Sequence, residues 1–128
     1  MSTKETQELL DLSQRLLDSI ATGDWETYTD LCDESLTAYE PEARGNRVSG
    51  LQFHRFYFDG EGPSARAQAS IIDPEVRIMG ECALVTYVRL TQRESSAGFT
   101  SGACEETRVW QMKSGRWQHV HFHRSVPS

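Results

Sequence analysis

The chain has 128 residues and a mass of 14.5 kDa, which matches one folded domain and excludes a second catalytic domain of ordinary size. Its 38% hydrophobic and 25% charged residues exclude a disordered chain and a coiled-coil rod. A net charge of -6 argues against nucleic-acid partners, and the apolar stretches are too short to span a membrane. We therefore expect residues 1–128 to form a single domain with no nucleic-acid or membrane partner.

The charges are distributed unevenly. Residues 1–42 contain two basic and eleven acidic side chains, whereas residues 43–128 contain eleven basic and eight acidic ones. Eleven of the thirteen basic residues are arginines, whose guanidinium groups suit the recognition of carboxylates. The first third of the chain is thus acidic and the remainder is basic.

Motifs for nucleotide binding, secretion and structural zinc are missing. The sequence has no Walker-type or G-x-G-x-x-G phosphate loop, and its N-terminal residues lack the apolar core of a signal peptide. Cys32, Cys82 and Cys104 have no C-x-x-C spacing. We therefore expect a cytoplasmic protein with reduced thiols.

The N-terminal third of the chain predicts helices. Apolar residues recur at helical spacing from Leu9 to Ile20, which predicts an amphipathic helix over residues 3–22. Asp24 can cap a short second helix that follows it. The run LQFHRFYF, residues 51–58, predicts a third, short and buried helix, and the turn-rich DGEGPS follows.

The rest of the chain predicts a sheet. Segments rich in β-branched and aromatic residues, or with alternating polarity, are residues 36–39, 67–79, 82–93, 102–112 and 116–124. Asp73-Pro74 interrupts the second segment and predicts a bulge. The expected fold class is α+β, in which a long N-terminal helix and two short helices pack on a curved antiparallel sheet whose concave side forms a pocket.

Three arginines occupy strand positions that face the expected core. Arg89, Arg108 and Arg124 each share a strand face with apolar residues. In one interpretation a nearby carboxylate neutralises each guanidinium, and the candidates are Glu40, Glu105 and Glu106. In the other, the arginines form the cationic floor of a pocket for an acidic ligand.

The C-terminal run WQHVHFHRS places His119, His121 and His123 on one face of a regular strand. Such spacing can hold zinc, although a hydrogen-bonded core histidine is the commoner arrangement. His54 or His121 could also form a dyad with Asp73 for proton abstraction.

Five segments carry a family resemblance that runs from about residue 5 to residue 126. GDWETYTDLCDESLTAYEPEARGN, LQFHRFYF, VTYVRLTQ, EETRVW and GRWQHVHFHRS closely resemble the association, or hub, domain of calcium/calmodulin-dependent protein kinase II. The resemblance implies an NTF2-like fold and self-assembly into closed double rings, commonly dodecamers or tetradecamers, that gather kinase subunits carrying the same hub. It also implies no catalysis, no cofactor and no metal.

The resemblance further implies a pocket for small carboxylates or acidic peptide segments. The matching positions are Arg89 in VTYVRLTQ, Arg108 in EETRVW and Arg124 in HFHRS, with His54 and Tyr57 of FHRFYF at the rim. Animal members have a longer loop with an aromatic residue that can fold over the pocket, where this chain has the short DGEGPS. The sequence fits both a hub separated from its kinase and a free-standing hub protein.

Two other functions stay open. NTF2-like folds also host small isomerases and dehydratases that use a pocket histidine, and a carboxylate beside His54 would favour such an enzyme. A ligand-binding module whose assembly responds to an acidic metabolite is the other. The mass in solution separates a ring-forming hub from a monomeric enzyme.

Overall fold

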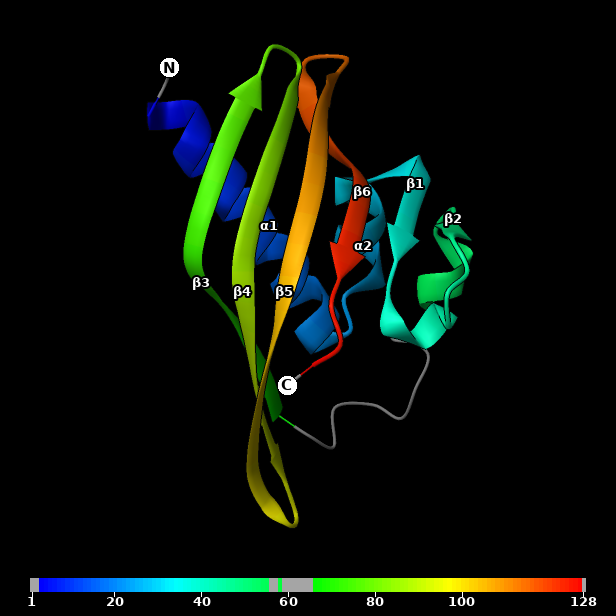
Figure 1. The fold of residues 1–128 in the computed structure, drawn as a ribbon, viewed down its shortest axis with the longest axis vertical. Helices are drawn as coiled ribbons and strands as arrows, with labels where there is room; N and C mark the ends of the chain where they lie inside the picture. The colour runs from blue at the N-terminus through cyan, green and yellow to red at the C-terminus, as the bar shows by residue number, and fades with distance from the viewer. Residues whose placement is uncertain (1–2, 56–57, 59–65, 128) are drawn as a thin grey trace.

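The computed structural model describes residues 3–55, 58 and 66–127 (Figure 1). In chain order, the elements are α1 (Thr3–Thr22), α2 (Trp25–Leu31), β1 (Cys32–Tyr39), the 3-10 turn η1 (Pro41–Ala43), β2 (Val48–Ser49), the 3-10 turn η2 (Gln52–Arg55), β3 (Arg66–Met79), β4 (Cys82–Ser95), β5 (Gly98–Lys113) and β6 (Arg116–Arg124). Neither α-helix in the described part of the chain is both long and apolar enough to cross a membrane.

Within the described residues the strands form one curved sheet in the order β2-β1-β6-β5-β4-β3. The long strands β3 to β6 form an antiparallel meander, as predicted. The predicted antiparallel sheet is confirmed with one exception, β1, which pairs with β6 in parallel. A parallel neighbour needs a long crossover connection, and the intervening strands β2 to β5 provide it.

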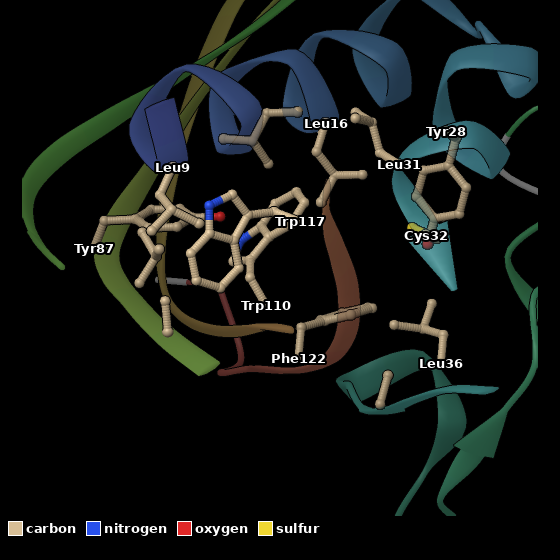
Figure 2. Close-up of a cluster of buried hydrophobic side chains, with 14 of the residues drawn as sticks. Leu9, Leu16, Tyr28, Leu31, Cys32, Leu36, Tyr87, Trp110, Trp117 and Phe122 are labelled. Atoms are coloured by element: carbon tan, nitrogen blue, oxygen red, sulfur yellow. The ribbon is translucent and has the colours of Figure 1, made fainter. Parts of the chain in front are cut away.

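Helix α1 covers one face of the sheet, and the opposite face of β3, β4 and β5 is not covered by any described element (Figure 1). Leu9, Leu16 and Leu17 of α1 are fully buried. Figure 2 shows Leu9 and Leu16 pointing toward Trp110 and Trp117 of the sheet. Burial of each leucine contributes about 1.5–3 kcal/mol, so this contact fixes the long helix on the sheet.

The predicted second helix is confirmed as α2. The Asp24 carboxylate accepts hydrogen bonds from the Thr27 amide at 3.1 Å and the Thr27 hydroxyl at 2.6 Å, which satisfies an otherwise unpaired helical N–H group. The helix ends where Cys32 adopts an extended conformation. Strand β1 therefore begins at Cys32, four residues before the predicted start.

Bulges alter the alternation of side chains in β3 and β6, and the pairing of β1 with β6 also shifts between Cys32 and Thr37. The predicted bulge in β3 is confirmed, because the pairing with β4 shifts between Ile72 and Glu75 and Asp73 has a φ of 51°. A second bulge in β6 was not predicted. Trp110 pairs with His119 and the preceding Val109 pairs with His121, so Val120 is the extra residue.

The predicted strand segments 82–93 and 102–112 are longer in the structure, as β4 and β5. Ser95 pairs directly with Gly98, so a two-residue turn joins β4 to β5, and both strands continue as a twisted hairpin beyond the helices (Figure 1). Gly98 supplies the φ of 109° that this turn needs. Of the predicted third helix over residues 51–58, the structure describes the 3-10 turn η2 and the helical Phe58, and residues 56–57 lie outside the described residues.

Candidate functional site

The register of β4, β5 and β6 collects charged side chains on the face that α1 covers. Tyr87 pairs with Glu106, and Glu106 pairs in turn with Arg124. Arg108 lies two positions after Glu106 on β5 and pairs with Phe122. Because residues two apart share a strand face, Glu106 and Arg108 point into the same interior.

Glu106 is the centre of this cluster, and its side chain is fully buried. Its Oε1 accepts hydrogen bonds from the Tyr87 hydroxyl at 2.6 Å and from Arg108 Nη2 at 3.0 Å. Its Oε2 accepts from Arg89 Nη1 at 3.0 Å, and Arg124 Nε lies 3.9 Å away. One carboxylate thus gathers all three guanidinium groups that the sequence singled out.

Arg108 is held entirely by protein groups. Its side chain is 1% exposed. Besides Glu106, its Nε donates to the Tyr87 hydroxyl at 2.7 Å, its Nη1 lies 3.3 Å from His119 Nε2, and its guanidinium carbon lies 4.5 Å from the centre of the Phe122 ring. Arg108 therefore supports the floor of the site, whereas the partly exposed Arg89 and Arg124 face its interior.

The buried charges stabilise one another. Burial alone would raise the pKa of Glu106, but Arg108 and Arg89 lower it to about 2. Burial alone would lower the pKa of Arg108, and Glu106 raises it above its ordinary value. Both groups are therefore charged at neutral pH, which explains how a strand centre tolerates them.

A cavity of about 110 Å³ lies over the cluster. Ile20, Tyr28 and Phe122 are among its apolar lining residues. Its polar and charged lining residues are Glu40, Glu42, His54, Arg89, Arg93, Arg108 and Arg124. A larger cavity of about 340 Å³ shares Arg89, Arg93 and Arg124 with it. The smaller cavity has the size of a molecule with a few heavy atoms and combines an apolar wall with guanidinium groups.

The positive charges exceed the negative ones around this cavity. Among the described residues, Arg89 and Arg108 pair with Glu106 and Arg124 pairs with Glu42, and Arg93 and Glu40 also line the cavity. Such a cluster can accept an anion, because a further carboxylate offsets repulsion among the guanidinium groups.

His54 and Glu40 form a buried pair at the same cavity. His54 Nε2 lies 2.6 Å from Glu40 Oε2, and the two side chains are 2% and 0% exposed. Glu40 directly follows β1, and η2 carries His54. The predicted dyad with Asp73 does not form, because Asp73 is exposed in the β3 bulge, whereas His54 pairs with the buried Glu40 and His121 Nδ1 lies 2.7 Å from the Thr37 hydroxyl.

The β6 bulge separates the three histidines that were candidates for zinc. His119 is fully buried beneath α1, with Nδ1 3.4 Å from Cys32 Sγ. His121 and His123 lie beyond the bulge and pack their rings against the partly exposed Tyr39. The zinc interpretation is therefore wrong, and within the described ranges no three metal-binding side chains gather at one point.

The structure brings Arg89, Arg108, Arg124 and His54 to one cavity, and Tyr57 lies outside the described residues. Sequence reasoning missed Glu42 and Tyr28 as cavity residues. The helical spacing of Tyr28 indicates a core residue, whereas no feature of the sequence around Glu42 indicates that it lines a cavity.

Comparison with known proteins places this geometry in a family. Residues 5–128 match the sequence profile described as the calcium/calmodulin dependent protein kinase II association domain. The chain belongs to this family. The resemblance noted from the five segments is thereby confirmed.

Relatives of the association domain cover nearly all of the chain. It is 45% identical over 123 residues to the calcium/calmodulin-dependent protein kinase type II subunit delta of Oryctolagus cuniculus, a match that covers 93% of this chain and 23% of that protein. The chain therefore spans about a quarter of the length of this relative.

Solved structures agree with the fold. The association domain of C. elegans CaMKII has a TM-score of 0.89 at 44% identity, and the match covers 96% of each chain. The CamKII hub homology domain of Chlamydamonas reinhardtii has a TM-score of 0.88 at 43% identity and covers 95% of this chain and 98% of its own. An NTF2-like superfamily protein of Salmonella enterica, 20% identical, has a TM-score of 0.77 and covers 95% of this chain and 90% of its own, which confirms the NTF2-like α+β fold.

Proposed function

We propose that this association domain is a non-enzymatic self-association hub of the cytoplasm, which assembles into a closed double ring of twelve or more copies. Further partners are kinase subunits that carry the same domain. The observation that carries the proposal is the family match over residues 5–128.

The uncovered sheet face supports self-association. Ile72 is 44% exposed on this face and pairs with the half-buried Val88. Leu84 pairs with Val109 on the same face, and both are half-buried. Apolar side chains on an open sheet face are typical of a surface that a second protein layer covers.

The charge distribution supports a ring in particular. The acidic helices and β1 form one part of the subunit and the basic β3 to β6 form another. Unlike surfaces that attract one another give head-to-tail contacts, and these contacts close into a ring when the rotation between copies permits.

Native mass spectrometry at micromolar protein tests the assembly. We expect a closed oligomer of at least twelve copies for the wild type and smaller species for Ile72→Lys. Met79→Lys is the matched control, because Met79 is 58% exposed on the same strand but lies at its end. A monomer or dimer of the wild type at moderate salt contradicts the hub proposal.

We further infer that the cavity binds a small carboxylate or an acidic peptide side chain. Arg89 and Arg124, each 12% exposed, grip the anion, and Arg108 holds Glu106 beneath them. Tyr28 and Phe122 pack against the aliphatic part of the ligand, next to His54. Each charge-assisted hydrogen bond contributes about 1.5–3 kcal/mol, which corresponds to binding at about micromolar to millimolar concentration.

Calorimetric titration with lactate and with a short acidic peptide tests this pocket. Arg89→Gln should abolish binding and leave the oligomer mass unchanged. Arg77→Gln is the control, since Arg77 forms an exposed pair with Glu75 on β3. Equal affinity of the wild type and Arg89→Gln contradicts the assignment.

The His54–Glu40 pair favours a second candidate function, that of a small-molecule isomerase or dehydratase. A carboxylate that orients a histidine beside a carboxylate-binding site is the arrangement of a general base for proton abstraction. Exchange of the Cα hydrogen of 2- and 3-hydroxy acids in D2O, followed by NMR, tests it. If the wild type exchanges this hydrogen and His54→Gln does not, the enzyme function is established. If the wild type shows no exchange, the enzyme function is rejected.

A further inference from the structure

Glu42 lies at the mouth of the arginine cavity. It belongs to η1, directly after Pro41, and its Oε1 accepts a hydrogen bond from Arg124 Nη2. Glu42 lines the small cavity over the cluster, the larger cavity beside it and a third, shallow one. The carboxylate therefore lies where these spaces adjoin.

The two carboxylates of the cluster differ in how firmly they are held. The Glu106 side chain is 0% exposed and accepts hydrogen bonds from Tyr87, Arg89 and Arg108. The Glu42 side chain is 36% exposed and comes from a short turn at the rim. Glu106 is part of the floor, whereas solvent and solutes reach Glu42.

The Arg124 guanidinium contacts the two carboxylates through different nitrogen atoms. Its Nε lies 3.9 Å from Glu106 in the floor, and its Nη2 bonds to Glu42 at the mouth. A ligand carboxylate that enters the cavity approaches from the mouth and needs the outward N–H groups of Arg124. Glu42 bonds to one of these groups, Nη2.

We propose that Glu42 is an internal competitor for the ligand. Its carboxylate occupies the outward side of Arg124, and a small carboxylate binds there by displacing it. Glu42 thereby weakens binding of every carboxylate and sets the affinity of the cavity. This inference rests on the proposed carboxylate-binding function.

Glu42→Gln tests the competition, because it keeps the shape of the side chain and removes the charge. We expect acetate and lactate to bind about three- to ten-fold more tightly to this variant at constant ionic strength, since a partly exposed ion pair no longer has to be broken. Glu34→Gln is the matched control, an exposed carboxylate on β1, and should leave the affinity unchanged.

A double variant shows whether the gain passes through Arg124. In the Arg124→Gln background, where the weaker binding that remains through Arg89 is titrated at high ligand concentration, Glu42→Gln should give no further gain, because the contested guanidinium is gone. Thermal unfolding without ligand checks that each variant is folded. An equal gain in both backgrounds would mean that Glu42 acts only through long-range charge, and it would overturn the proposal.

The remaining outcomes separate the two proposals. If the wild type binds the carboxylate and Glu42→Gln binds it with equal or lower affinity, the proposal that Glu42 competes is overturned, and the proposed carboxylate pocket is unaffected. Binding by Glu42→Gln alone supports the competitor strongly. No binding by any folded variant overturns the pocket, and the competitor with it.

Discussion

Arg108 and Glu106 lie two residues apart on β5 and form an ion pair of 3.0 Å in which neither side chain is more than 1% exposed. Residues two apart on a strand project side by side from the same face of the sheet, so a direct ion pair between them in a core is unusual. Here the Tyr87 hydroxyl lies between them, donating to Glu106 and accepting from Arg108. The pair thus makes a rigid, charged floor for the cavity above it.

Removal of Arg108 should destabilise the fold rather than only empty the pocket. Arg108→Met leaves the Glu106 charge buried with fewer partners, and we expect a loss of about 3–5 kcal/mol in the free energy of unfolding. Urea denaturation measures it. Arg77→Met breaks only an exposed pair and should cost less than about 1 kcal/mol. Similar stabilities of the two variants would contradict the structural role of Arg108.

Glu106 should make the protein sensitive to acid. Its pKa is lowered from 4.5 to about 2 in the fold, so its contribution to stability is complete above pH 4.5 and is lost as the pH falls toward 2. The dependence of the unfolding free energy on pH in this window should be weaker in Glu106→Gln by up to about 1.4 kcal/mol per pH unit. Parallel curves for the two proteins would rule out this role for Glu106.

His119 should oppose folding at mildly acidic pH. Burial first, and then the nearby Arg108 charge, lower its pKa well below 6.5, so the unfolded chain takes up a proton that the folded chain does not. Stability is therefore lost as the pH falls below about 6.5. His119→Gln keeps an acceptor for Arg108 and should show a smaller loss between pH 7 and 5. Above pH 7.5 the difference between the two proteins should be constant, which serves as the control.

Two buried serines of α1 should respond oppositely to substitution. The Ser13 hydroxyl has no hydrogen-bond partner within the described residues, so Ser13→Ala removes an unsatisfied group and should raise stability by about 1 kcal/mol. The Ser19 hydroxyl donates to the Leu16 carbonyl at 2.6 Å, and Ser19→Ala should be neutral or destabilising. Both substitutions raise helix propensity by the same amount. The difference between their effects on thermal stability therefore measures the difference in hydrogen bonding between the two hydroxyl groups. A loss of stability in Ser13→Ala would contradict this.

Local sequence patterns were sufficient to predict most helices and strands and the core-facing positions of the three arginines. The apolar spacing of α1, the Asp24 cap and the Asp73-Pro74 interruption act over a few residues, so each could be read from neighbouring positions. The placement of Arg89, Arg108 and Arg124 on core-facing strand positions followed from the alternation of side chains alone.

The sequence by itself determined the fold class, the acidic and basic parts of the chain and the presence of charges in a core, because periodicity and composition record them directly. Only the tertiary structure decided which charges meet. The parallel pairing of β1 with β6 brings Glu40 and Glu42 to the cavity, and the bulge at Val120 turns His119 inward and His121 outward. Strand register is set by the packing of the sheet against both helices, and one extra residue reverses every side chain beyond it, so no local pattern contains this information.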